Sequence, residues 1–277
     1  MVPVKKNEIF IFFNLNLQKK LIVSCKYFFS LSNNYFRFKQ FTIKQDRCAM
    51  KVTTDGCLFG AWVAERIKDE KPTNNKNCLD IGTGTGLLSL MLAQKSPSME
   101  FDAIEINEEA AQQAKENTTA SPWKEKITVI PGDAKDKAFA TGRLYDVIIS
   151  NPPFYENELV SPDEKKNIAH HGGGLLLEEI VKIISDVLAP GGCFYLLLPY
   201  KRMTEAGLLI EKYRLTVTHS TLVSPSTQHG YFRLFVAGKH KGSTNESYSK
   251  NEIAVKDSNG EYTTAFISLL KDYYLYL

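Results

Sequence analysis

Short apolar runs alternate with helical patterns of hydrophobic residues from residue 77 to residue 213. The first helical pattern begins at residue 86, and three others cover residues 107–118, 175–188 and 204–213. The apolar runs have the length of strands and occupy residues 78–81, 101–106, 127–130, 145–150 and 193–198. Strand-like runs that alternate with helices predict an open α/β sheet, mostly parallel, with helices on both faces.

Two further apolar runs, at residues 215–223 and 231–237, are separated by only a short polar loop. A short connection favours antiparallel pairing, because a parallel crossover needs a dozen or more residues. We therefore expect a C-terminal antiparallel hairpin to close the sheet. Ahead of the sheet, residues 56–67 predict an amphipathic helix beside the ligand-binding edge. Residues 239–250 are expected to be an exposed loop before the C-terminal tail.

Composition adds a domain boundary and a charge asymmetry to this pattern. With 43% hydrophobic and 23% charged residues, the chain has ordinary globular composition, so we expect a single domain over residues 36–277. Residues 1–35 lack clear periodicity and are expected to be a poorly ordered extension, with an upstream start codon or a weak signal peptide as alternatives. The first fifty residues hold nine Lys or Arg and two acidic residues, a net charge of +7. This charge indicates a polyanionic partner, or only a solvated face.

The spacing of the cysteines and the length of the apolar runs indicate where in the cell the protein is located. The five cysteines show no C-x-x-C pair and no zinc-ligand spacing, which is typical of reduced thiols in a cytoplasmic protein without a bound metal. No apolar run reaches the roughly 18 residues that a membrane-spanning helix needs. We therefore expect a cytoplasmic protein with no membrane segment.

Three glycines stand at alternate positions where the first strand is expected to turn into a helix. Gly82, Gly84 and Gly86 follow Asp80 in a G-x-G-x-G spacing. Glycine allows strained backbone angles and a close approach of the ligand. The dinucleotide spacing G-x-G-x-x-G places a pyrophosphate on a helix N-terminus, whereas this tighter spacing favours a ligand without phosphate. Asp80 is expected to hold its amino acid end, and a purely structural turn is the alternative.

Acidic residues stand at the ends of the next two strands. Glu105 lies 25 residues after Asp80, close to the roughly 20 at which nucleoside-binding sheets place a carboxylate on ribose hydroxyls. Asp133 follows the third strand, where a carboxylate can accept from an adenine amine. Each acid alone is typical of an exposed surface. Together with the glycine loop, they predict a site for S-adenosylmethionine at the carboxyl edge of the sheet.

The tetrapeptide Asn151-Pro152-Pro153-Phe154 follows the fourth strand directly. As structure, two prolines only end a strand. As chemistry, the Asn151 side-chain oxygen and the Pro152 carbonyl can accept both N–H groups of an exocyclic amine, redirecting a lone pair that is otherwise delocalised. Pro153 stiffens the backbone, and Phe154 offers a stacking face for an extruded base. The tetrapeptide predicts methyl transfer to an amino nitrogen, and His170, in a later glycine-rich loop, is a weaker substrate candidate.

Other runs resemble the bacterial family of valine-tRNA adenine-N6 methyltransferases. They are Phe-Lys-Gln-Phe at 38–41, Asp-Arg-Cys-Ala-Met-Lys at 46–51, Thr-Asp-Gly at 54–56, Gly-Ala-Trp at 60–62, Ser-Pro-Trp at 121–123 and the aromatic tail at 262–277. The resemblance implies a Rossmann-like class I methyltransferase that methylates adenine 37 of a valine tRNA. It further implies that Lys51 and Thr54 lie near the methionine part of the cofactor. The basic residues in the matched region are candidates for RNA contact: Arg37, Lys39, Lys44 and Arg47.

The glycine loop and the tetrapeptide leave other activities open. A guanine-N2 methyltransferase acting on rRNA and a glutamine-N5 methyltransferase acting on a protein share both motifs, and a non-catalytic RNA-binding protein that senses S-adenosylmethionine is a more distant alternative. The choice of an adenine in tRNA therefore depends on the resemblance of residues 36–62. Family members often have Tyr at the position of Phe154, which keeps the stacking face here but lacks a hydroxyl.

Overall fold

Strands with apolar side chains on both faces build the centre of the protein. The computed structural model describes residues 34–48, 50–69, 76–136, 142–153, 175–242 and 248–277. In β7 (Leu188–Pro199), odd-numbered residues from 193 to 197 pack into one hydrophobic core and even-numbered residues from 194 to 198 pack into another. A strand with this alternation must be covered by other elements on both sides.

The described strands form an eight-stranded sheet in the order β10-β8-β9-β7-β6-β3-β4-β5. Strand β9 runs antiparallel to its neighbours β7 and β8, and the other adjacent pairs are parallel. This confirms the mostly parallel sheet and its C-terminal antiparallel hairpin. The remaining strands are β3 (Asn77–Ile81), β4 (Glu100–Glu105), β5 (Ile127–Pro131), β6 (Tyr145–Ser150), β8 (Leu215–Ser226), β9 (Arg233–His240) and β10 (Ser249–Lys256).

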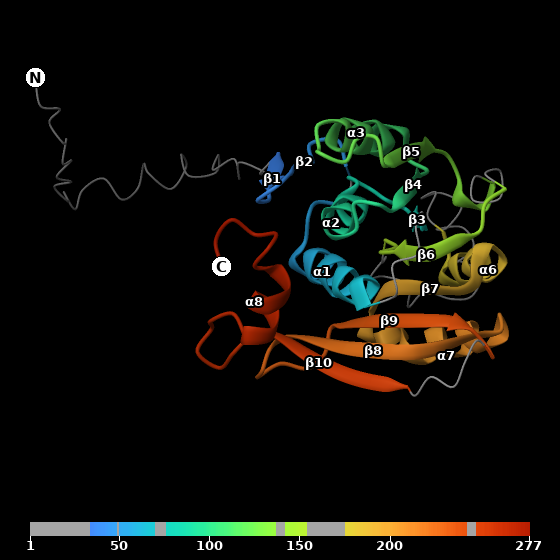
Figure 1. Ribbon diagram of the computed structural model, residues 1–277. Helices are drawn as coiled ribbons and strands as arrows, with labels where there is room; N and C mark the ends of the chain where they lie inside the picture. Colours follow the sequence, from blue (N-terminus) through green and yellow to red (C-terminus); the bar gives the residue numbers. More distant parts are fainter. Residues whose placement is uncertain (1–33, 49, 70–75, 137–141, 154–174, 243–247) are drawn as a thin grey trace, which may run out of the picture. The chain divides into compact units, whose positions relative to one another are not determined.

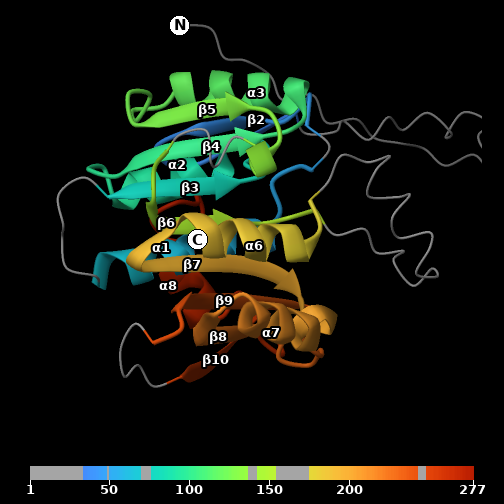
Figure 2. The ribbon, with the colours of Figure 1, turned by 90° about the vertical axis from the view of Figure 1, so that its right-hand side faces the viewer.

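Helices cover both faces of the sheet, as expected. Figures 1 and 2 show α1, α2 and α8 on one face and α6 and α7 on the other. The expected helix start at Asn107 is confirmed, because its side-chain oxygen accepts a hydrogen bond from the Ala110 N–H. The helices are α1 (Thr54–Asp69), α2 (Leu87–Lys95), α3 (Glu108–Thr119), α6 (Leu177–Val187), α7 (Met203–Lys212) and α8 (Thr264–Leu270).

Near the C-terminus, the structure contains a strand and a helix that the hydrophobic pattern did not predict. Strand β10 includes the last part of the loop expected over residues 239–250 and lies parallel to β8 at the sheet edge. Only Val255 is buried in β10, so the edge strand lacks the apolar alternation of a central strand. The aromatic tail contains α8, and its N-cap is Thr263, whose hydroxyl accepts from the Phe266 N–H.

Helix α1 is also not amphipathic in the way expected over residues 56–67, because it does not have one buried and one exposed face along this length. Residues 56–64 are all buried, since α2, α8 and the sheet pack around the helix. The Trp62 indole N–H donates to the Thr221 hydroxyl of β8 at 3.0 Å within this core. Ahead of α1, β1 (Tyr35–Arg37) and β2 (Thr42–Lys44) form a separate antiparallel pair.

Gly238 provides a test of how closely the closing hairpin packs. A Cβ atom there would lie 2.4 Å from Phe194 Cζ and 2.3 Å from the Thr216 carbonyl oxygen. We predict that Gly238→Ala lowers the free energy of unfolding by about 2 kcal/mol or more, because overpacking typically costs about 1–3 kcal/mol. Gly207→Ala in α7 is the matched control, since an added Cβ meets no atom within 4 Å, and it should stabilise by about 0.5–1 kcal/mol. Urea denaturation measures both, and equal effects would contradict the packing argument.

Candidate functional site

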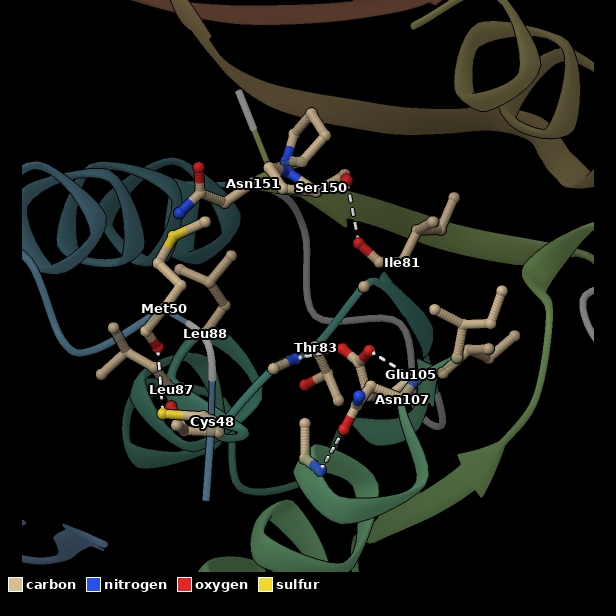
Figure 3. A pocket seen from close by; sticks show the side chains of 18 of the residues that line it. Cys48, Met50, Ile81, Thr83, Leu87, Leu88, Glu105, Asn107, Ser150 and Asn151 are labelled. Atoms are coloured by element: carbon tan, nitrogen blue, oxygen red, sulfur yellow. Dashed lines mark hydrogen bonds between the residues drawn. The ribbon is translucent and has the colours of Figure 1, made fainter. Parts of the chain in front are cut away.

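One pocket lies at the carboxyl ends of neighbouring strands β3, β4 and β6 (Figure 3). Strands β4 and β6 flank β3 on opposite sides, so this edge is where the strand order reverses and where α/β sheets bind ligands. The pocket brings together most residues expected to bind cofactor or to catalyse: Lys51, Gly82, Gly84, Glu105, Asp133, Asn151, Pro152 and Pro153.

The three glycines of the loop all have left-handed backbone angles, with φ of 72° at Gly82, 58° at Gly84 and 82° at Gly86. Other residues are strained in this region. A Cβ atom added at Gly82 or Gly84 would meet no atom within 4 Å, so these two leave open space on the pocket side. Gly86 instead faces α3, where an added Cβ would lie 3.4 Å from Thr118. Gly86 does not line the pocket and begins α2 as its N-cap.

Asp80 lies fully buried behind the glycine loop and does not line the pocket. Its Oδ2 accepts hydrogen bonds from the hydroxyls of Thr83 and Ser89, both at 2.7 Å. Its Oδ1 has no hydrogen-bond partner among the described residues. Burial raises the pKa of this carboxyl to about 6. A buried polar oxygen without a protein partner is rare and indicates a place for a polar ligand or a water.

Glu105 and Asp133 line the pocket, and both accept hydrogen bonds from backbone N–H groups. Glu105 Oε2 accepts from the Gly84 N–H at 2.8 Å, and its Oε1 accepts from the Asn107 N–H at 3.0 Å. This carboxylate therefore ties the glycine loop to the start of α3. Asp133 Oδ1 accepts from the Lys135 N–H at 2.9 Å, which fixes the turn after β5.

Asn151 lies on the other side of the pocket from Glu105. The Ser150 hydroxyl donates to the Ile81 carbonyl at 2.8 Å and fixes the end of β6 against β3. A Cβ added to Gly56, in the first turn of α1, would lie 3.7 Å from Asn151 Nδ2. Figure 3 shows the Asn151 amide on the same side as Met50 and Leu88, with Glu105 and Asn107 opposite. Residues 152 and 153 are buried and exposed, respectively.

Not every expected residue lies in the pocket. Thr54 is exposed at the start of α1, and its neighbour Thr53 lines the pocket and accepts from the Gly56 N–H at 3.2 Å. The RNA-contact candidates Arg37, Lys39, Lys44 and Arg47 do not line it. Lys39 donates to the Lys271 carbonyl, and Arg47 forms an ion pair with Glu116. Phe154 and His170 lie outside the described residues.

Residues 44–48 and 50–53, which we call the strap, form a pocket wall that residue types alone did not reveal. Cys48, Met50 and Thr53 of the strap line the pocket. Two buried amides on α3, Gln113 and Asn117, hydrogen bond to the first half of the strap. The available signal was their helical spacing of four on a buried face that otherwise holds three alanines and Thr118, where an amide needs a polar partner.

No group of three or more His, Cys, Asp or Glu side chains in the described residues is arranged to hold a metal ion. No helix in the same residues combines the length and the apolar character needed to cross a membrane.

Comparisons with known proteins agree with this geometry. The profile of the Methyltransferase small domain family matches residues 62–199. The fold is similar to the crystal structure of a predicted O-methyltransferase from Agrobacterium tumefaciens, with a TM-score of 0.59 and 17% identity, covering 79% of this chain and 96% of that chain. It is also similar to a candidate class I S-adenosylmethionine-dependent methyltransferase from Listeria monocytogenes, with a TM-score of 0.55 and 14% identity over 73% of this chain and 68% of that one. These likenesses show the class I methyltransferase fold.

Curated relatives are similar over nearly their whole length. A tRNA1(Val) (adenine(37)-N6)-methyltransferase from Dyadobacter fermentans is 38% identical over 88% of this chain and 98% of its own length. The protein of the same name from Bacteroides thetaiotaomicron is 36% identical over 89% of this chain and 100% of its own length. The resemblance of residues 36–62 to this family is thereby confirmed. The chain belongs to the tRNA1(Val) (adenine(37)-N6)-methyltransferase family.

Proposed function

We propose that the protein transfers a methyl group from S-adenosylmethionine to N6 of an adenine in tRNA, the adenine at position 37 of a valine tRNA. The relatives of the same family carry this activity in their names. The observation that carries the proposal is the position of Asn151 and Pro152 in the pocket that the glycine loop opens. The proposal also assigns the protein to the cytoplasm, where tRNA is found.

The pocket fits S-adenosylmethionine in shape and in polar groups. Open space above Gly82 and Gly84 admits a ligand directly against the backbone. The unpartnered Asp80 Oδ1 lies behind the pocket wall and suits the cofactor's amino group through a bridging water. Glu105 retains acceptor capacity for ribose hydroxyls, because each carboxylate oxygen can accept a second hydrogen bond. When bound, the cofactor supplies a strongly electrophilic methyl group.

The two sides of the pocket suggest how the cofactor lies. Glu105 and Asp133 offer carboxylates for the ribose and the adenine amine. Met50 lies with Asn151 toward the other side (Figure 3). Thr53 lies there too, because a Cβ at Gly56 would be 3.1 Å from Thr53 Oγ1 and 3.7 Å from Asn151 Nδ2. This side, with the neighbouring Lys51, is where we place the methionine end. In this orientation the transferable methyl group faces Asn151. Thr53 therefore takes the place near the methionine end that the sequence suggested for Thr54.

Asn151 and Pro152 act on the amine rather than on the methyl group. The Asn151 side-chain oxygen and the Pro152 carbonyl accept the two N–H groups of the adenine amine, so that its lone pair turns out of the ring plane toward the methyl group. Neither oxygen is a strong base. The extra proton leaves the nitrogen to solvent after the new N–C bond has formed. Stacking of the extruded base on Phe154 remains part of the proposal.

The mechanism predicts a large rate loss for Asn151→Ala. Removing one preorganised hydrogen-bonding group from an active site typically lowers kcat by about 10²–10³-fold. The affinity for S-adenosylmethionine should stay within about twofold, since the substitution removes no proposed cofactor contact. Single-turnover methylation of unmodified valine tRNA and isothermal titration with the cofactor measure the two quantities. A variant that methylates tRNA at the wild-type rate would refute the assigned role.

Asp80 predicts a pH dependence of cofactor binding. Its pKa is raised to about 6 by burial, and a cationic amino group binds better to the ionised carboxylate. The affinity for S-adenosylmethionine should therefore rise with pH through about 6, and fall by up to about tenfold per pH unit below it. Asp80→Asn should bind more weakly above pH 6 and lose this dependence. Titration calorimetry between pH 5 and 8 measures it, and identical pH profiles for the two proteins would exclude contact with Asp80.

The choice among nucleobases and proteins as substrate has a direct test. Total tRNA and rRNA from a strain lacking the gene are digested to nucleosides, and the methylated nucleosides are measured by mass spectrometry. We expect N6-methyladenosine to disappear from valine tRNA and to return on complementation. Loss of N2-methylguanosine from rRNA would instead support the guanine alternative. An unchanged RNA profile would favour a protein substrate or a binding role.

A further inference from the structure

The first residue of the strap, Lys44, still pairs with Tyr35 of β1, and side chains of α3 hold the strap from Lys44 to Arg47. Gln113 Oε1 accepts from the Arg47 N–H at 3.1 Å, and Gln113 Nε2 donates to Asp46 Oδ1 at 2.7 Å. Within the strap, Gln45 Oε1 accepts from the Val52 N–H at 2.9 Å. The first half of the strap is thus fixed to α3, and the bond from Gln45 to Val52 carries that constraint to the half that lines the pocket.

Asn117 is the one of these groups that also binds the glycine loop. Its Oδ1 accepts from the Lys44 N–H at 2.9 Å, and its Nδ2 donates to the Lys44 carbonyl at 3.0 Å. The same Nδ2 donates to the Thr85 carbonyl at 2.9 Å. The side chain is only 2% exposed, so water does not replace these bonds. Asn117 therefore fixes the distance between the strap and the glycine loop.

Both structures that Asn117 joins are walls of the same pocket. Thr83, Gly84 and Thr85 form one wall, and Met50, Lys51 and Thr53 of the strap form another. Asn117 itself does not line the pocket. Any effect on a ligand must act through the walls, because the side chain cannot touch it.

We propose that Asn117 is a positioning residue for the methionine end of S-adenosylmethionine. The inference rests on the proposed function for the orientation of the cofactor. Figure 3 shows the strap residues Cys48 and Met50 on the Asn151 side of the pocket, and Glu105 and Asn107 on the other. A loosened strap therefore widens the pocket around the methionine end. The ribose and adenine end keeps Glu105, which the Gly84 and Asn107 N–H groups hold independently of Asn117.

The test compares two ligands on the full-length protein. For Asn117→Ala we expect the dissociation constant of S-adenosylmethionine to rise by about tenfold or more, because the loss of one to two net hydrogen bonds corresponds to a factor of this size. The dissociation constant of adenosine should stay within about threefold of the wild-type value. Isothermal titration calorimetry measures both ligands. Asn117→Asp keeps the side-chain size and the acceptor for the Lys44 N–H but removes both donated bonds, and should show the same selective loss.

Ser121→Ala is the matched control. The Ser121 hydroxyl donates to the Thr118 carbonyl at 2.7 Å and accepts from the Trp123 N–H, so it is a buried hydrogen-bonding group just after α3 without contact to the strap. We expect this variant to bind both ligands as the wild type does. Equal weakening of adenosine and S-adenosylmethionine by the Asn117 variants, no weakening at all, or loss of folding in both variants would overturn the proposal.

These outcomes are separable from failure of the proposed function. The two titrations need no RNA, so a wild-type protein that binds S-adenosylmethionine but methylates no tRNA would refute the substrate and leave the role of Asn117 standing. Conversely, tRNA methylation with a normal cofactor affinity in Asn117→Ala would refute only the positioning role.

Discussion

The turn from β3 into α2 is the constraint on which the site depends. Three left-handed glycines at alternate positions give that turn little stiffness of its own. Two buried carboxylates supply it: Asp80 binds the Thr83 and Ser89 hydroxyls from below, and Glu105 binds the Gly84 N–H from the neighbouring strand. Because both acids stand on adjacent parallel strands, the sheet itself sets the shape of the loop.

The remaining walls are built around this loop by elements that are distant in sequence. Helix α3 packs against Gly86 through Ala114 and Thr118, and its Asn117 reaches both the loop and the strap. The strap thus becomes part of the pocket wall. This arrangement is the basis of the positioning role that we propose for Asn117.

The side of the pocket that holds Asn151 is likewise fixed from several directions. Ser150 ties the end of β6 to β3, and the first turn of α1 lies against Asn151. Asp55 in that turn forms an ion pair with Arg233 at the start of β9, with 2.6 Å between Oδ2 and Nε. The closing hairpin is therefore connected to the residue that we propose orients the amine. Elements fixed on several sides of Asn151 suit the proposed reaction, which depends on orientation rather than on a base.

The sequence by itself determined what depends on local backbone and on periodicity. It predicted the central strands and helices, the left-handed glycines and the Asn107 cap, because each follows from residues a few positions apart. It also predicted that Asn151 and Pro152 lie at the ligand-binding edge, where the structure shows both lining the pocket, because they directly follow a strand of the sheet. Tertiary structure alone decided the burial of α1 on all sides, the pairing of β10, and the place of Thr53 rather than Thr54 in the pocket. It also decided the hydrogen bonds of Asp80 and Asn117. Each of these depends on which segments, distant in sequence, the fold brings into contact. The sequence does not show which group will form the hydrogen bond with a polar residue once that residue is buried.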